Sequence, residues 1–422
     1  MVRGIGRSAL GLVISLVCMS GLAPAAPVSA ASGPTIIAAH REDAIDVRGN
    51  STFGTVASVS LPAGNWLVSA NALLVGTDYV SRIECQLFAG STSYKGRTLT
   101  SPSGVHSVTP LLLLWGAHYA TAGKASLKCY SNGATGDVLI RDVHLVAVKV
   151  GTLTTNAGTS GTGAPRAYAI QDPTLRVTSG GAGNYQDLQT LSLGAGRWLV
   201  QATGWYAETD GDAQIDCRLQ AAGSTADQAS GFMPKFNEYS VGLEGIVALS
   251  AATTVHLQCA SSASLIIYGS AINTLKIGTL RYGQLGSSQT SSGSGTPVVD
   301  AGYTEAPAYV ASGDTLTKIA SYSLPAGDWV TTASETLINA APATEACQLA
   351  LGAGRDLGRA KVAYANFTTE AAWFYTTLEE HLTSGKSAQV SCDESAGANT
   401  VLWWHLRIIG LEAGSLTDTA LP

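Results

Sequence analysis

One ten-residue phrase occurs three times in this chain of 422 residues. It reads LPAGNWLVSA, LGAGRWLVQA and LPAGDWVTTA, and its tryptophans are Trp66, Trp198 and Trp329, which lie 132 and 131 residues apart. A period of this length is too long for a solenoid unit and matches a whole domain. The sequence therefore predicts three tandem copies of one domain.

Cysteines recur at matching offsets behind each tryptophan. Those outside the first 31 residues are Cys85, Cys129, Cys217, Cys259, Cys347 and Cys392. In IECQL and its counterparts the cysteine alternates in phase with apolar neighbours, so each sulfur points into the core of its copy. For an exported chain we expect one disulfide per copy, Cys85–Cys129, Cys217–Cys259 and Cys347–Cys392. The alternative is reduced cysteines that pack as small hydrophobic residues.

Apolar residues alternate with polar ones behind the repeated turn. Trp66, Val68 and Ala70 share one side of the predicted strand, which places the repeated tryptophan in the core of its copy. The preceding PAG or GAG is typical of a turn in which glycine takes a positive φ. Amphipathic helical windows are scarce, so the pattern predicts an all-β protein of three tandem β-sandwich domains.

The first 31 residues have the pattern of a secretory signal peptide. MVRGIGR supplies positive charge, an apolar stretch follows, and PAAPVSA ends in small residues. A membrane anchor is the alternative, but the apolar run breaks at Gly21 and Pro24, and no later stretch is apolar enough to span a bilayer. We therefore expect a secreted, extracellular protein.

Composition shifts mark the borders between the copies. TNAGTSGTGAP and GQLGSSQTSSGSGTP are rich in Gly, Ser and Thr and carry no charge, which is typical of flexible tethers. The expected organisation is a signal peptide (1–31), repeat 1 (32–153), a linker (154–165), repeat 2 (166–282), a linker (283–297) and repeat 3 (298–417).

The order of features within a copy resembles a known domain family. LPAGNW gives an early strand after a turn, LTSGKSAQVSC from Leu382 a late strand, and VHLVAVKV from Val143 an apolar last strand. Together they resemble the jelly-roll domains of the complement globular head and tumour necrosis factor families, across almost all of the mature chain. The resemblance implies jelly-roll-like sandwiches that assemble as trimers, so one chain could build an intramolecular pseudo-trimer and remain monomeric. An immunoglobulin-like sandwich is the rival, but there the tryptophan lies between the two cysteines.

Some apolar side chains exceed what one sandwich core needs. PLLLLW and AAWFY are apolar on both strand faces, and two tryptophans are adjacent near the C-terminus. We expect an interface between repeats at Trp115, Trp373, Phe374, Trp403 and Trp404. The alternative is burial under loops of the same copy.

Charge and motifs exclude several kinds of chemistry. The net charge of -6 includes no basic run, which argues against nucleic acid as a partner. No metal-binding His-x-x-x-His, nucleophile elbow or phosphate loop occurs, and His144 and His405 are interpreted as equivalent positions. The acidic ETDGDAQID offers Asp210 and Asp212 as a weak calcium candidate, although a solvated hairpin is favoured. HRED from His40 is interpreted as a surface charge cluster, and no cofactor is expected.

Two classes of function remain. The first is a secreted, non-enzymatic binding or adhesion protein whose partner is an unknown protein or glycan. The second is a structural, self-assembling surface component without a small ligand. A hydrolase with a site assembled between repeats is a more distant alternative, because a catalytic triad is defined by geometry and not by motif.

Overall fold

Alternation of apolar and polar residues produces strands throughout. The computed structural model describes residues 33–47, 52–76, 82–89, 92–98, 107–132, 138–172, 176–178, 181, 183–208, 213–233, 238–285, 290–304, 308–309, 313–339, 344–351, 356–363, 370–394 and 401–421. Every regular element among them is a β-strand. None of these residues forms a helix with the length and apolarity of a membrane span.

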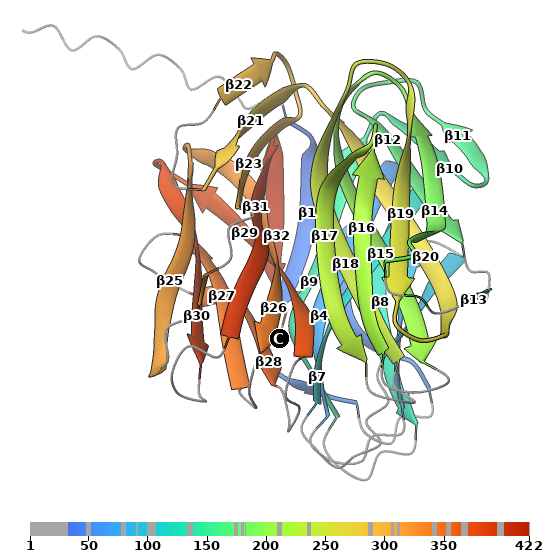
Figure 1. Ribbon diagram of the computed structural model, residues 1–422. Helices are drawn as coiled ribbons and strands as arrows, with labels where there is room; N and C mark the ends of the chain where they lie inside the picture. The colour runs from blue at the N-terminus through green and yellow to red at the C-terminus, as the bar shows by residue number, and fades with distance from the viewer. Residues whose placement is uncertain are drawn as a thin grey trace, which may run out of the picture. The chain divides into compact units, whose positions relative to one another are not determined.

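Repeat 1 consists of two sheets, drawn from blue to blue-green in Figure 1. Apolar side chains between the two sheets form its core. The inner sheet has the order β1 (Thr35–Arg41), β9 (Val138–Val150), β4 (Gly64–Gly76) and β7 (Ser107–Tyr119), with β2 (Ile45–Asp46) also paired to β9. The outer sheet has the order β3 (Gly54–Leu61), β8 (Gly123–Asn132), β5 (Arg82–Ala89) and β6 (Thr92–Thr98).

Repeats 2 and 3 use the same strand order. In repeat 2 the inner sheet is β12 (Arg166–Asp172), β20 (Leu265–Ile277), β15 (Gly196–Glu208) and β18 (Glu238–Leu249), with β13 (Arg176–Thr178), and the outer sheet is β14 (Gln186–Leu193), β19 (Thr253–Ser261), β16 (Ala213–Ala221) and β17 (Ser224–Met233). In repeat 3 the inner sheet is β23 (Val298–Thr304), β31 (Val401–Ala413), β26 (Gly327–Asn339) and β29 (Glu370–Leu382), with β24 (Ala308–Tyr309) also paired to β31. The outer sheet of repeat 3 is β25 (Gly313–Leu324), β30 (Lys386–Glu394), β27 (Thr344–Leu351) and β28 (Asp356–Ala363). Two four-stranded sheets, with first and last strands paired, make a jelly-roll-like sandwich, which confirms the predicted fold class.

The repeated phrase builds the centre of each sandwich. Trp66, Trp198 and Trp329 are buried, and each indole Nε1 donates to the carbonyl oxygen four residues earlier, at 3.0, 3.0 and 3.1 Å. The glycine two residues before each tryptophan has a φ of 141°, 136° or 150°, which a side chain would disfavour. The phrase therefore encodes a glycine turn that aims a tryptophan into the core.

Each disulfide joins directly opposed residues of the outer sheet. Cys85 on β5 faces Cys129 on β8, and the pairs Cys217–Cys259 and Cys347–Cys392 occupy the same place in the other repeats. All six sulfurs are buried, as the alternation predicted. The three predicted disulfides are confirmed, and they fit an oxidising compartment.

Replacing a repeated tryptophan should be costly. We expect Trp198→Ala to lower the free energy of unfolding by about 3–5 kcal/mol, because a large buried side chain leaves a cavity. Chemical denaturation followed by circular dichroism measures the change. Arg197→Ala, next along the strand and half-buried, is the matched control. Equal stabilities of the two variants would contradict the assignment of Trp198 to the core.

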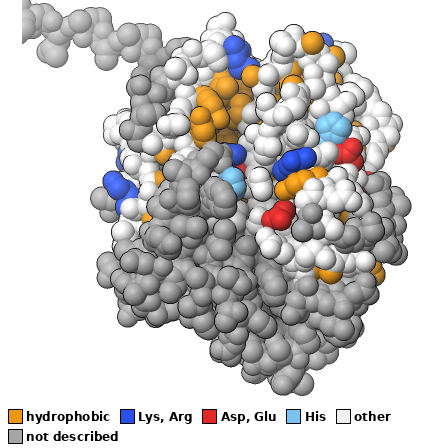
Figure 2. Space-filling view, in the orientation of Figure 1, with side chains coloured by type: hydrophobic (Ala, Val, Ile, Leu, Met, Phe, Trp, Pro, Cys, Tyr) orange, Lys and Arg blue, Asp and Glu red, His pale blue; other side chains and the backbone are white. Residues whose placement is uncertain are grey.

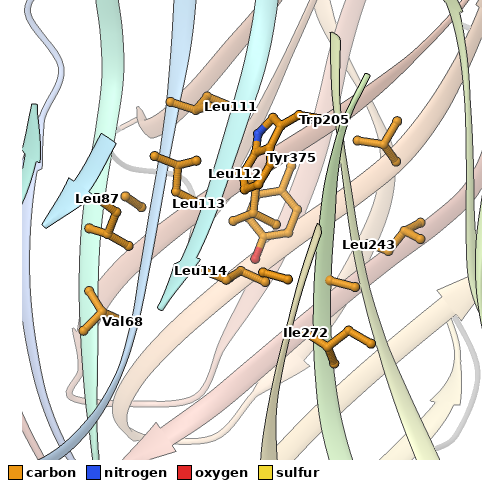
Figure 3. Close-up of a cluster of buried hydrophobic side chains, with 14 of the residues drawn as sticks. Val68, Leu87, Leu111, Leu112, Leu113, Leu114, Trp205, Leu243, Ile272 and Tyr375 are labelled. Atoms are coloured by element: carbon orange, nitrogen blue, oxygen red, sulfur yellow. The ribbon is translucent and has the colours of Figure 1, made fainter. Parts of the chain in front are cut away.

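The inner sheets are buried on both faces. On β7, Leu111 and Leu113 point toward Leu87 and Val68, whereas Leu112 and Leu114 point the other way, toward the aromatic side chains of repeats 2 and 3 (Figure 3). The equivalent residues Leu67, Leu199 and Val330 belong to one buried cluster shared by the three repeats. Two-sided burial explains the near-continuous apolar runs of these strands.

Of the predicted interface residues, some face another repeat and some face the core of their own repeat, according to their place in the strand alternation. Trp373 lies between repeats, where its indole donates to the carbonyl oxygen of Ser240 in repeat 2. Phe374 was predicted to join it but instead packs in the core of repeat 3, because adjacent residues of a strand face opposite sides. Trp115, half-buried, shares the face of Leu113 and so points to the core of repeat 1. The side chains of Trp403 and Trp404 lie outside the described residues.

The segments predicted as flexible tethers contain paired strands in their described parts. After repeat 1, β10 (Thr152–Thr155) pairs in parallel with β12 of repeat 2 and forms a hairpin with β11 (Gly158–Ser160). After repeat 2, β21 (Thr279–Gln284) pairs in parallel with β23 of repeat 3 and with β22 (Thr290–Gly293). Gly/Ser/Thr composition does not exclude pairing with a free sheet edge.

The C-terminal strand closes the circle. β32 (Ser415–Ala420) pairs in parallel with β1, the first strand of repeat 1, in the register that β10 and β21 adopt on their own partners. At each junction a backbone amide donates to a proline carbonyl oxygen at 2.9 Å: Gly151 to Pro165, Gly278 to Pro297 and Gly414 to Pro34. The three repeats thus form a ring within one chain.

Removing the closing strand should open this ring. A chain ending at Gly414 lacks β32 and leaves the edge of β1 unpaired, and such edges associate. We expect a lower melting temperature and concentration-dependent oligomers, measured by thermal denaturation and by light scattering after size exclusion. The control is the full chain with Thr417→Ala and Thr419→Ala, two exposed positions that keep the backbone pairing. A monodisperse truncated monomer of unchanged stability would show that β32 is dispensable.

Candidate functional site

The most elaborate polar cluster lies between repeats 2 and 3 and is buried. Arg407 Nε donates to Asp227 Oδ1 at 2.6 Å, and the Glu244 backbone amide donates to Asp227 Oδ2 at 2.8 Å. Glu244 itself accepts hydrogen bonds from Gln201 Nε2 at 2.9 Å and from the Thr332 hydroxyl. Burial raises the pKa of the Glu244 carboxyl to about 7.

This cluster joins repeats 2 and 3 through Arg407 and Asp227 and through Thr332 and Glu244. A cavity of about 50 Å³ beside it is lined by residues of all three inner sheets, including Leu67, Gln201 and Thr332. Such a volume holds water molecules. The carboxyls of Asp227 and Glu244 are engaged by side chains and backbone of repeats 2 and 3.

A second buried carboxyl lies in the core of repeat 3. Glu335 Oε1 is 3.5 Å from Cys392 Sγ, and within the described part of the chain Oε2 has no hydrogen-bond partner. Because a disulfide sulfur carries no hydrogen, only a protonated Glu335 can donate across this contact. Burial raises the pKa of the Glu335 carboxyl to about 8, so the proton stays on the acid at neutral pH.

The protonated Glu335 makes stability depend on pH. A carboxyl whose pKa rises from its ordinary 4.5 to about 8 on folding stabilises the fold fully below pH 4.5. Its contribution falls by up to about 1.4 kcal/mol per pH unit between these values. Denaturant titrations at several pH values should show this decline in the wild type and a flatter profile for Glu335→Gln. Identical profiles would contradict the assignment.

The histidines contribute no catalytic triad among the described residues. The inner sheets align His144 with Ala271 and Arg407, so the predicted equivalence of His144 and His405 is wrong. Glu412 pairs with Trp329 as Lys149 pairs with Trp66, which places Arg407 and not His405 opposite the position of His144. His256 and His381 form exposed pairs with aspartates. The calcium candidates Asp210 and Asp212 lie outside the described residues, while Asp216 accepts a hydrogen bond from Ser230 Oγ at 2.5 Å.

The outer sheet of repeat 2 carries an accessible polar network. Asp187 on β14 accepts from His256 Nδ1 at 3.0 Å and from Gln258 Nε2 at 2.8 Å, both on β19. Gln258 Oε1 in turn accepts from Arg218 Nε on β16 at 3.0 Å, and the Arg218 guanidinium lies 3.8 Å from the Tyr185 ring centroid. The network therefore presents a carboxylate, an amide, an imidazole and a cation-covered ring on one sheet.

This outer sheet network faces solvent. The side chains of His256 and Asp187 are 31% and 44% exposed. Figure 2 shows acidic, basic, histidine and hydrophobic side chains gathered on the right of the view, where Figure 1 draws β14, β16 and β19. Hydrogen-bonded neighbours hold these groups in place, which lowers the entropy lost when a ligand binds.

The same positions carry different chemistry in the other repeats. Strand register aligns Arg218 and Gln258 with Gln86 and Lys128 of repeat 1. In repeat 1 the Lys128 amino group lies 4.6 Å from the Phe88 ring centroid. The scaffold is therefore the same while the side chains differ, and Gln86 is buried whereas Arg218 is half-buried. The sequence analysis did not predict this network. Strand alternation nevertheless places Arg218 on the outer face of the sheet, because the adjacent Cys217 points into the core.

Comparisons with known proteins show no family. No family model matches the chain, and no curated protein matches it. Among solved structures, one reported for the triple jelly roll fold and turret assembly of an archaeal virus is 9% identical, with a TM-score of 0.20, and covers 91% of this chain and 92% of that one. The Gx strain of infectious bursal disease virus gives 8% identity, a TM-score of 0.23 and coverage of 86% and 83%. The CBM22-1-CBM22-2 tandem domain of Paenibacillus barcinonensis Xyn10C gives 11%, 0.19 and coverage of 58% and 98%. TM-scores this low carry no argument about family or function.

Proposed function

We propose that this chain is a secreted, non-enzymatic binding protein whose outer sheets recognise glycans. The carrying observation is the exposed network of Tyr185, Arg218, Gln258, Asp187 and His256 on a disulfide-stapled sheet. Its carboxylate and amide can accept and donate hydrogen bonds to sugar hydroxyls, and the Arg218 guanidinium stacked on the half-exposed Tyr185 ring adds further N–H donors. The signal-like N-terminus and three disulfides support export.

Closure of the ring favours this function over self-assembly. A head-to-tail filament needs a free tail strand and a free acceptor edge. Here β32 occupies β1 of the same chain, so both are used internally. The resemblance to complement globular heads and tumour necrosis factor supports the same picture, in which the trimer of that family is built from three repeats of one chain.

The proposed assembly predicts a compact monomer. We expect a radius of gyration of about 22 Å in small-angle scattering, by the scaling for compact chains. Sedimentation should give one chain per particle over a wide concentration range. Ordered multimers of the intact chain would instead support the structural, self-assembling alternative.

Binding to a glycan should depend on the outer sheet network. A panel of soluble neutral and acidic polysaccharides, tested by biolayer interferometry, should include at least one that binds the wild type. We expect Tyr185→Ala and Arg218→Ala each to weaken that binding at least tenfold, because each removes part of the contact surface, with little change in melting temperature. Lys318→Ala on the outer sheet of repeat 3 is the exposed control. Wild-type binding by both variants, or no binding by any polysaccharide, would overturn the proposal.

A further inference from the structure

Side chains of the types that bind metal ions lie close together at the closing junction, where β32 pairs with β1. His40 lies on β1, His144 directly opposite it on β9, Glu379 on β29 of repeat 3 and Asp418 on the closing strand β32. The ligand atoms of His40, Glu379 and Asp418 all lie within 4.8 Å of one another. The two imidazole rings are stacked with centroids 6.3 Å apart. Elements from both ends of the chain thus bring two imidazoles and two carboxylates together.

Their present contacts leave one buried oxygen unused. His40 Nδ1 is 2.9 Å from Asp418 Oδ2, and His144 Nδ1 is 2.9 Å from Glu379 Oε2. Glu379 is 4% exposed, yet its Oε1 has no hydrogen-bond partner among the described residues. An unpartnered carboxylate oxygen in such a place is costly, and a cation would compensate for it.

The fold does not require these residues. Strand register places Gln171, Ala271, Gly116 and Thr155 at the four equivalent positions of the junction between repeats 1 and 2. The junction between repeats 2 and 3 has Tyr303, Arg407, Ile246 and Tyr282 there, with the two tyrosine rings stacked at 4.8 Å. Both junctions form without a metal-ligand set, so these side chains at the closing junction have another role.

We propose that the closing junction binds a divalent transition metal ion of the zinc class. His40, Asp418 and Glu379 supply the ligands, and His144 either completes the set or orients Glu379 through its hydrogen bond. Imidazole and carboxylate groups are the ligands such ions prefer, and a tetrahedral site with bonds of about 2.1 Å spaces its ligand atoms about 3.4 Å apart. His40 Nδ1 and Asp418 Oδ2, now 2.9 Å apart, have to separate by about 0.5 Å to reach this spacing. The ion replaces the proton on His40 Nδ1, which is released to solvent.

The bound ion stabilises the closed form of the ring. It joins the C-terminal strand β32 to repeat 1 through His40 and to repeat 3 through Glu379. Since the ion binds only the closed arrangement, it stabilises closure by mass action. HRED from His40 was interpreted as a surface charge cluster; in the proposal its first residue is a metal ligand.

The test uses the untagged full chain, stripped with a chelator and titrated with Zn²⁺ by isothermal calorimetry. We expect one ion per chain, a melting temperature raised by Zn²⁺, and the visible absorption of tetrahedral Co²⁺ when cobalt replaces zinc. Asp418→Asn and His40→Ala, on half-exposed or exposed positions, should each weaken binding at least tenfold and abolish the thermal shift.

His256→Ala is the matched control, because His256 also pairs with an aspartate, Asp187, at 3.0 Å but without a second carboxylate among its described contacts. It should bind Zn²⁺ like the wild type. Absence of stoichiometric binding, or binding that Asp418→Asn and His40→Ala leave unchanged, would overturn the proposal. Because glycan binding is not measured, the outcome is independent of the proposed function.

Discussion

Parallel pairing between a tail strand and the first strand of the next repeat organises the whole molecule. Three times the chain leaves a sandwich, crosses a glycine and adds a strand to its neighbour, and the third time the neighbour is repeat 1. A sheet edge that would otherwise be free is thereby covered at each junction. Because both ends of the chain take part in the last pairing, closure is a property of the complete chain and not of any one repeat.

That closure permits the inner sheets to be apolar on both faces. One face fills the sandwich around a buried tryptophan, and the other meets the two neighbouring repeats. A few buried polar pairs interrupt these apolar faces, and they differ between junctions. Arg407 pairs with Asp227 between repeats 2 and 3, and His144 pairs with Glu379 between repeats 1 and 3. Buried pairs that match only one partner disfavour a wrong order of repeats, since mismatched pairing would leave a buried charge alone.

The outer sheets are under weaker constraints. Their disulfides and core-facing residues recur, whereas the position after the first cysteine changes from Gln86, which is buried, to Arg218 and Gln348, which are half-buried. Recognition can therefore differ between repeats without disturbing the ring. The closing junction follows the same logic, because metal-ligand side chains occupy positions that carry Gln171 and Tyr303 elsewhere.

The sequence alone determined the repeat, the all-β class, the disulfide pairing and the burial of Trp198, because these follow from periodicity and parity within one copy. Parity also separates Trp373 from Phe374, yet which of the two faces meets another repeat depends on packing. Only the tertiary structure decided that the Gly/Ser/Thr segments form strands, because a partner edge has to be present before such residues pair. It also decided that His40 and Asp418, 378 residues apart, lie side by side. No local pattern encodes that contact, since it arises from ring closure by the C-terminal strand.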